Sequence, residues 1–257
     1  MQIQLKQSKI NSFSELKITG SKSESNRVLL LQALFEGLEI KNVSNSDDSQ
    51  LMQKALKTDA SVVDIHHAGT AMRFLTAYYA TRLGKTTTLT GSSRMQERPI
   101  KILVDALNAL GASISYTKND GYPPLLIESK TLTKSSVQMK ANISSQYISA
   151  LLLIAPTLEN GLTLHLEGEI TSTPYIKMTL SLLNELGVQT SFESNAIRVL
   201  PFHQLTSKTF VVESDWSSAS YFYSIVALSP VGTQIAISEY KSTSLQGDAV
   251  LQKIYKD

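Results

Sequence analysis

The sequence predicts an α/β protein that is built from repeated units around buried helices. Three observations indicate this class. A small polar cluster leads directly into an apolar helix at four places, an amphipathic helix that ends in Leu-Gly recurs, and short strands bounded by turn residues lie between the helices. Internal repeats of this kind, with strands and helices alternating, are typical of layered α/β folds.

The first repeated element is the polar cluster with its apolar helix. The clusters occupy residues 21–27 before VLLLQAL, 68–73 before FLTAYYA, 144–146 before YISALLLIA, and 217–220 before YFYSIVAL. Helices that are apolar nearly all round belong in a protein interior. We therefore expect all four helices to be buried.

The second repeated element is an amphipathic helix that ends in Leu-Gly and continues into a strand. Its copies are LVDALNALGASISY (103–116) and LSLLNELGVQTSF (180–192), and a degenerate copy at 51–60 lacks the glycine. Gly111 and Gly187 fit the left-handed position that closes a helix. Strands are expected at 86–89, 125–127 and 162–166, which gives the order strand, helix, strand, helix, strand, strand about three times between residues 20 and 212.

Composition excludes several classes of protein. The chain has 257 residues and a net charge of +2, which offers no general field for nucleic acid or acidic membranes. It contains no cysteine, so disulfide scaffolds and thiolate chemistry are excluded, and its four histidines lack the spacing of metal ligands. The first residues resemble a strand with Ile3 and Leu5 rather than a secretory signal, and we expect a cytoplasmic protein.

The end of the chain resembles the start of another amphipathic helix. Residues 251–256 (LQKIYK) have the right pattern, but no Leu-Gly closure follows. We expect a truncated chain, because domains rarely end inside a periodic helix. A short, frayed terminal helix is the alternative.

The helix starts are candidate anion sites. A helix N-terminus presents free N–H groups and a partial positive charge. Lys22, Arg27 and Arg73 lie at or just beyond two such starts, and Arg98 precedes a proline that opens another helix. If these starts converge, they suit a ligand with more than one anionic group, such as a phosphate and a carboxylate. The alternative is that the Ser and Thr clusters are ordinary helix caps.

Other motifs are better explained by structure. Residues 84–86 (GKT) lack the earlier glycine of a phosphate-binding loop, and residues 47–48 (DD) favour a helix cap over a Mg²⁺ site. The histidines at 66–67 fit the end of a strand. We expect Trp216 and residues 221–223 to lie in a core.

Six motifs, in order, resemble the 5-enolpyruvylshikimate-3-phosphate synthase family, whose members are 3-phosphoshikimate 1-carboxyvinyltransferases. They are GSKSESNR (20–27), AGTAMRFL (68–75), RMQERPI (94–100), ISSQY (143–147), STPYI (172–176) and DWSSASY (215–221), with QGD (246–248) as a late echo. The resemblance implies an inside-out barrel domain of three βαβαββ units at 21–212. Residues 1–20 and 213–257 would then be an incomplete part of a second such domain.

The resemblance also implies an activity and a set of site residues. The family transfers the enolpyruvyl group of phosphoenolpyruvate to the 5-hydroxyl of shikimate 3-phosphate and releases phosphate, without metal or organic cofactor. Lys22 would be catalytic and would touch both substrates. The pocket for shikimate 3-phosphate would comprise Lys22, Ser23, Arg27, Ser144, Ser145, Gln146, Ser172 and Tyr175. The phosphoenolpyruvate site would comprise Lys22, Gly69, Thr70, Arg73, Arg98 and Gln146.

The sequence also departs from the family pattern. His67 stands where asparagine is common and Phe74 where proline is frequent, and His67 is expected to affect the fit of phosphoenolpyruvate or of inhibitors such as glyphosate. The acidic catalytic residues of the family lie in a second half that this chain does not match. We therefore expect a monomeric chain that binds substrate without turnover. The alternatives are an enzyme like the UDP-N-acetylglucosamine enolpyruvyl transferases, which the absence of cysteine disfavours, and a non-catalytic anion-binding module.

Overall fold

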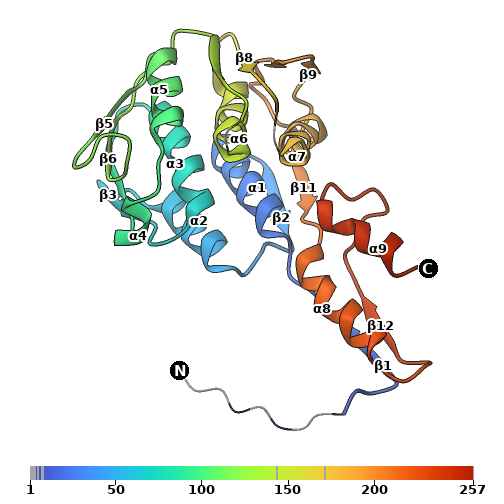
Figure 1. Ribbon diagram of the computed structural model, residues 1–257. Coiled ribbons are helices and arrows are strands. Elements are labelled where there is room, and N and C mark those ends of the chain that lie inside the picture. The colour runs from blue at the N-terminus through green and yellow to red at the C-terminus, as the bar shows by residue number, and fades with distance from the viewer. Residues whose placement is uncertain (1–3, 5, 7–8, 143, 171, 257) are drawn as a thin grey trace.

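Two complete copies of one unit form most of the molecule (Figure 1). The computed structural model describes residues 4, 6, 9–142, 144–170 and 172–256. The first unit contains β3 (Val62–Asp64), α3 (Gly69–Thr81), β4 (Thr86–Thr90), α4 (Ser93–Gln96), α5 (Lys101–Leu110), β5 (Ser113–Tyr116) and β6 (Leu125–Glu128). The second contains β7 (Ser136–Lys140), α6 (Ser145–Ile154), β8 (Leu162–Glu167), α7 (Thr173–Glu185), β9 (Thr190–Glu193) and β10 (Ala196–Val199).

The two units have the same sheet topology. Their strand orders are β3-β4-β6-β5 and β7-β8-β10-β9. In each sheet the first two strands are parallel and the other neighbours are antiparallel. The repeat predicted from the sequence, with its strands near 86–89, 125–127 and 162–166, is confirmed in these two units.

A third unit is shorter within the described residues. It contains α1 (Lys22–Leu34), β2 (Leu38–Lys41) and α2 (Asp47–Lys57), and β2 pairs in parallel with β11 (Lys208–Val211). The chain passes from α2 directly to β3, so the closing strand pair of the other two units has no counterpart here. The parallel pair of β2 and β11 corresponds to the parallel pairs β3-β4 and β7-β8, so β11, which follows the second unit in the chain, completes the sheet of this third unit.

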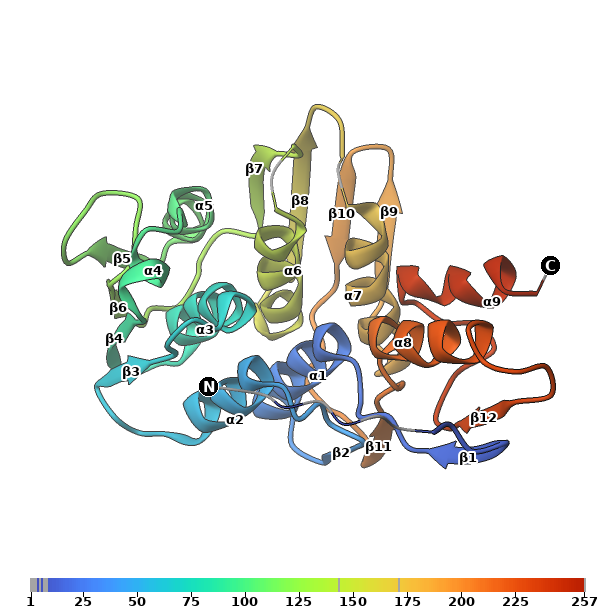
Figure 2. The ribbon, with the colours of Figure 1, turned by 60° about the horizontal axis from the view of Figure 1, so that its bottom comes forward.

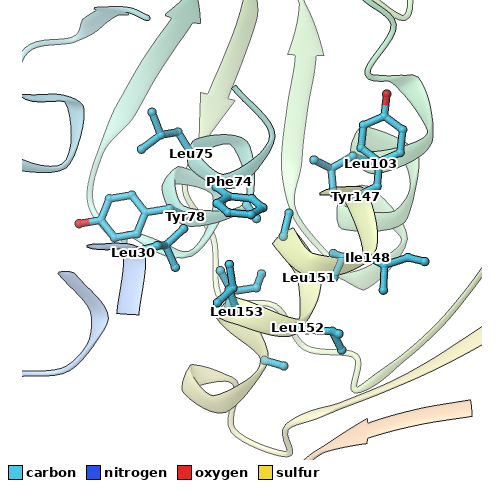
Figure 3. Packing of buried hydrophobic residues seen from close by; sticks show 14 of the residues in the cluster. Leu30, Phe74, Leu75, Tyr78, Leu103, Tyr147, Ile148, Leu151, Leu152 and Leu153 are labelled. Atoms are coloured by element: carbon cyan, nitrogen blue, oxygen red, sulfur yellow. The ribbon is translucent and has the colours of Figure 1, made fainter. Parts of the chain in front are cut away.

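Three helices lie at the centre of the molecule, and their side chains form its main core (Figures 2 and 3). In α3 every residue from Gly69 to Ala80 is buried, and α6 is buried over nearly its whole length. Leu30 of α1, Phe74 of α3 and Leu151 of α6 are fully inaccessible members of one cluster. The prediction that apolar-all-round helices are buried is confirmed for α1, α3 and α6, because each is surrounded by sheets and other helices.

The Leu-Gly closures adopt the expected conformation. Gly111 has φ 114° and its N–H donates to the carbonyl oxygen of Leu107, while Gly187 has φ 98° and donates to that of Asn184. A residue with a Cβ is strained in this left-handed region, so glycine ends both helices at low cost.

A second, smaller cluster lies apart from the main core. It joins Ile18, Trp216 and Ala219 with partly buried neighbours from α8 (Trp216–Ala227) and β12 (Gln234–Ile237). The strand β12 pairs in parallel with β1 (Phe13–Leu16). At the junction with the main core, Gly20 bridges Ser214, and a Cβ on Gly20 would overlap the carbonyl oxygen of Asn42. Glycine is therefore required at this crossing.

The prediction that the helix after residue 220 is buried is wrong. In α8 the buried residues are Trp216 and Ala219, whereas Tyr221 is 72% exposed and Leu228 is 89% exposed. Trp216 is a core residue as expected, but Tyr221 is not. The physical reason is that β12 and the chain before α9 (Leu251–Ile254) cover one side of α8, and no described element covers the other (Figure 2).

The two ends of the chain add little packing. The expected helix at residues 251–256 is reduced to one helical turn, α9 (Leu251–Ile254), without a buried residue. The strand-like residues Ile3 and Leu5 lie outside the described part of the chain. Among the described helices, none has the length and apolarity needed to cross a membrane.

Candidate functional site

Arg27 joins the starts of three helices. Its Nε donates to Thr179 Oγ1 at 2.8 Å, its Nη2 to Ser149 Oγ at 3.0 Å, and its Nη1 to the carbonyl oxygen of Ser23 at 2.7 Å. These partners lie in the first two turns of α7, α6 and α1. The three helices therefore begin close together.

The charge of Arg27 is buried, and its hydrogen bonds go to neutral oxygen atoms. The residue is 2% exposed, and burial lowers the pKa of its guanidinium to about 10. Its guanidinium also lies 5.9 Å from the ring centroid of Tyr175 and 5.4 Å from that of Phe74. The charge of Glu24 acts in the opposite direction and raises this pKa, but within the described residues Arg27 forms no ion pair. A buried cation bound by hydroxyl and carbonyl oxygens favours an anion at the helix starts.

The residues expected around shikimate 3-phosphate lie at these starts. Ser23 and Tyr175 line a cavity of about 160 Å³ together with residues 245–248 of the C-terminal segment. Ser144 accepts a hydrogen bond from the N–H of Gln146, and Ser145 opens α6. Lys22 is an exposed side chain at the start of α1, and Ser172 precedes α7 in a left-handed conformation with φ 56°.

The residues expected around phosphoenolpyruvate form a second group at the start of α3. Gln146 Nε2 lies 3.4 Å from Thr70 Oγ1, which brings the first turns of α6 and α3 together. Arg73 Nη1 donates to the carbonyl oxygen of Gly69 at 2.9 Å. A Cβ built on Gly69 would overlap Nη1 of Arg98, so the Arg98 side chain lies directly against this glycine.

This second group is cationic and poor in internal partners. Within the part of the chain that the structure describes, neither Arg73 nor Arg98 forms an ion pair with a carboxylate. Arg73 is 5% exposed, its Nε has no hydrogen-bond partner, and burial together with the charge of Arg98 lowers its pKa. The helix start at Ala68 has no side-chain cap. Two neighbouring guanidinium groups beside uncapped N–H donors are arranged to bind an anion.

Two carboxylates that the sequence analysis did not single out connect α1 to the C-terminal segment. Glu24 accepts from the N–H of Glu213 at 2.7 Å and lies 3.3 Å from Lys241 Nζ. Glu213 in turn accepts from Trp216 Nε1–H at 2.9 Å. Both carboxylates are 2% exposed. They hold the smaller cluster in a set position relative to the helix starts.

Replacing Glu24 by Gln is expected to change how stability depends on pH. Burial raises the pKa of Glu24 above its ordinary 4.5, although Lys241 opposes this shift. An acid whose pKa is raised on folding binds its proton more tightly in the folded state, so wild-type stability falls as pH rises from 4.5 through the raised pKa. The Gln variant is neutral throughout. Urea unfolding from pH 4 to pH 8 should show the free energy of unfolding of Glu24→Gln rising relative to that of wild type across this window. Glu36→Gln, at an exposed position, should show no such rise. A difference between Glu24→Gln and wild type that is the same at every pH would contradict the prediction.

Small hydroxyl residues on apolar helices are the signal that sequence reasoning missed. Ser149 lies four residues after Ser145, and Thr179 four residues after Tyr175. Residues at this spacing share a helix face, so each hydroxyl follows a candidate site residue by one turn. They are buried because they bind Arg27.

The other motifs have structural roles or none that the contacts define. Ser46 caps α2 through the N–H of Ser49, and Asp48 accepts from Asn26, which agrees with the expected helix cap. His66 and His67 follow β3, with their Nδ1 atoms 3.0 Å apart. The described residues contain no group of three or more His, Asp or Glu side chains that could hold a metal ion.

The fold and the site together define an α/β protein of repeated units whose central helices begin close together, with several arginines at their N-termini. Comparisons with known proteins agree with this class. The family model for EPSP synthase (3-phosphoshikimate 1-carboxyvinyltransferase) matches residues 54–257, and the chain belongs to this family.

Two curated relatives illustrate the similarity. The 3-phosphoshikimate 1-carboxyvinyltransferase of Bacteroides fragilis is 50% identical over 238 residues, which are 91% of this chain and 57% of that protein. The one of Sulfurovum sp. is 39% identical over 271 residues, covering 93% of this chain and 62% of that protein. The chain therefore spans about three fifths of the length of these relatives.

A solved structure supports the fold. The EPSP synthase from Acinetobacter baumannii superimposes with a TM-score of 0.74 over 90% of this chain and 57% of that chain, at 20% sequence identity. At this identity the likeness concerns the fold alone. It agrees with the expected domain of repeated units with buried helices.

Proposed function

We propose that this chain is the substrate-binding part of a 3-phosphoshikimate 1-carboxyvinyltransferase of the shikimate pathway, which leads to aromatic amino acids. The complete enzyme transfers the enolpyruvyl group of phosphoenolpyruvate to the 5-hydroxyl of shikimate 3-phosphate and releases phosphate. One observation carries the proposal: Arg27, Arg73 and Arg98 lie at the joined helix starts, and none forms an ion pair within the described residues. Two anionic substrates side by side require such a concentration of positive charge.

The two groups at the helix starts divide the substrates between them. Shikimate 3-phosphate would bind at the cavity beside Ser23 and Tyr175, over buried Arg27, with Ser144, Ser145, Gln146 and Ser172 completing the pocket. Phosphoenolpyruvate would bind at Gly69, Thr70, Arg73, Arg98 and Gln146. Lys22 would lie between the two substrates and act as the catalytic cation. Its side chain is exposed on the first turn of α1, which allows it to move towards either substrate.

We further propose that residues 21–212 form one domain and that residues 1–20 and 213–257 belong to a second, incomplete one. In support, the main core runs from Val28 to Val212, while Ile18 and Trp216 lie in the separate cluster. The exposed apolar face of α8 agrees with a helix that packs against further chain in the complete enzyme. We expect this chain to be a cytoplasmic monomer that binds substrate and does not turn over, because the family resemblance places the acids for proton transfer in a second half that this chain does not match.

Replacing Lys22 by Ala tests the substrate assignment. We expect the wild-type chain to bind shikimate 3-phosphate in a saturable manner and Lys22→Ala to bind about tenfold to a hundredfold more weakly, since a charge-assisted hydrogen bond to a phosphate contributes on the order of 1.5–3 kcal/mol. Calorimetric titration measures both affinities, with inorganic phosphate at matched ionic strength as reference. Lys54→Ala is the control, because Lys54 is an exposed lysine in the last turn of α2.

The outcomes separate the alternatives. Equal heats for shikimate 3-phosphate and inorganic phosphate would contradict the proposal and would favour a general anion-binding module. Equal losses in Lys22→Ala and Lys54→Ala would show that the lysine acts through net charge and not through the site.

A further inference from the structure

We propose that Tyr147 is a positioning residue, which fixes Arg98 against the start of α3 through the carbonyl group of Pro99. Neither the motifs nor the family resemblance assigns Tyr147 a role. The inference rests on the proposed phosphoenolpyruvate site and deepens it, because it names the group that orients the Arg98 cation.

The segment that carries Arg98 has few contacts of its own. Both Arg98 and Pro99 are exposed, and they lie in the short connection between α4 and α5. The N–H of Arg98 donates to the carbonyl oxygen of Met95 at 3.1 Å. Pro99 has no N–H, so its carbonyl oxygen is the one backbone group by which it can be hydrogen bonded. An exposed segment with so few bonds needs a further contact to hold its position.

Tyr147 provides a hydrogen bond to this segment. Its hydroxyl donates to the carbonyl oxygen of Pro99 at 2.6 Å, and its side chain is 6% exposed on α6 (Figure 3). The same carbonyl oxygen lies 3.5 Å from Arg73 Nη2, a long contact that adds little. A buried tyrosine on a buried helix is a rigid donor, so its hydrogen bond holds the Arg98–Pro99 connection at a fixed position relative to α6.

The start of α6 contacts both α3 and the Arg98–Pro99 connection, so these three parts form a triangle of contacts. Gln146, the neighbour of Tyr147, reaches Thr70 at the start of α3. Arg73 of α3 lies with its guanidinium carbon 5.9 Å from the ring centroid of Tyr147. The first turn of α6 therefore contacts both α3 and the Arg98 connection, and its two adjacent side chains set the distance between Gly69 and Arg98. Loss of the Tyr147 hydroxyl opens one side of this triangle and leaves the ring packing in place.

The test is Tyr147→Phe, with Tyr79→Phe as a matched control. The Tyr79 hydroxyl also donates to a backbone carbonyl oxygen, that of Ala55, at 2.6 Å, and Tyr79 is 3% exposed. Tyr79 lies near the end of α3, away from the helix starts. Both variants delete one buried hydroxyl and one bond of equal length, so their effects on the temperature of unfolding should be alike.

The first readout needs no ligand. Phenylglyoxal modifies accessible arginines, and peptide mapping by mass spectrometry follows Arg98 against exposed Arg94 as an internal reference. In Tyr147→Phe we expect the modification rate at Arg98 to rise about threefold relative to Arg94. Loss of a hydrogen bond of typical net strength increases the population of displaced Arg98–Pro99 conformations by a factor of this order. Tyr79→Phe should match wild type. Equal Arg98 rates in the two variants would overturn the proposal.

The second readout is ligand affinity, measured by calorimetry on the same proteins. We expect Tyr147→Phe to bind phosphoenolpyruvate about fivefold more weakly in the presence of shikimate 3-phosphate, and to bind shikimate 3-phosphate itself as wild type does. Unchanged phosphoenolpyruvate affinity in a variant with faster Arg98 modification would also overturn the proposal. A wild-type chain that binds neither substrate would contradict the proposed function, while the modification rates would still decide whether Tyr147 positions Arg98.

Discussion

Replacing Gly69 by Ala is expected to reduce phosphoenolpyruvate binding by about tenfold or more while leaving the fold intact. The added Cβ would overlap Nη1 of Arg98 and lie 3.3 Å from Nη1 of Arg73. Arg98 is exposed and can turn away, so the strain is relieved by moving the cation out of the site. The backbone itself accepts alanine, because Gly69 is not among the residues with positive φ.

Stability separates this effect from misfolding. Gly69 is the first residue of α3, where alanine is accepted and the preference for it over glycine is smaller than the interior value of about 1 kcal/mol, so thermal unfolding of Gly69→Ala should occur near the wild-type temperature. Calorimetric titration with phosphoenolpyruvate measures the affinity. Gly84→Ala is the control for affinity alone, because a Cβ there meets no neighbouring atom, whereas its φ of 81° is expected to lower the temperature of unfolding. A Gly69→Ala variant with wild-type affinity would show that Arg98 does not bind the ligand from its observed position.

Replacing Phe74 by Ala is expected to destabilise the domain by about 3–5 kcal/mol. Phe74 is fully buried at the centre of the three-helix core (Figure 3), and its ring lies 5.4 Å from the buried guanidinium of Arg27. Its loss would leave a cavity next to an already desolvated charge, which adds to the cost. Urea unfolding measures the change.

An exposed residue on the same segment serves as control. Leu83 is 65% exposed, so Leu83→Ala should change the free energy of unfolding by no more than about 0.5 kcal/mol. A loss below about 1 kcal/mol in Phe74→Ala would mean that the core relaxes around the missing ring.

Much of the architecture could be predicted because local patterns and packing agree. The apolar residues of α3 and α6 leave no polar face, so these helices must be buried, and the Leu-Gly closures at Gly111 and Gly187 need a left-handed residue. The same pattern failed for α8, where Tyr221 is exposed. The residues of a helix indicate which of its faces are apolar, but they do not show whether another helix or strand packs against those faces.

The sequence by itself determined the class of fold, the order of its units and the helix starts at which cations gather, because periodicity and helix-closing residues act locally. Tertiary structure alone decided which starts meet. Arg27 is buried among hydroxyls on two other helices, 122 and 152 residues away, and Tyr147 reaches the carbonyl of Pro99 across 48 residues. Contacts of this range depend on how whole helices pack, and no spacing along the chain encodes them.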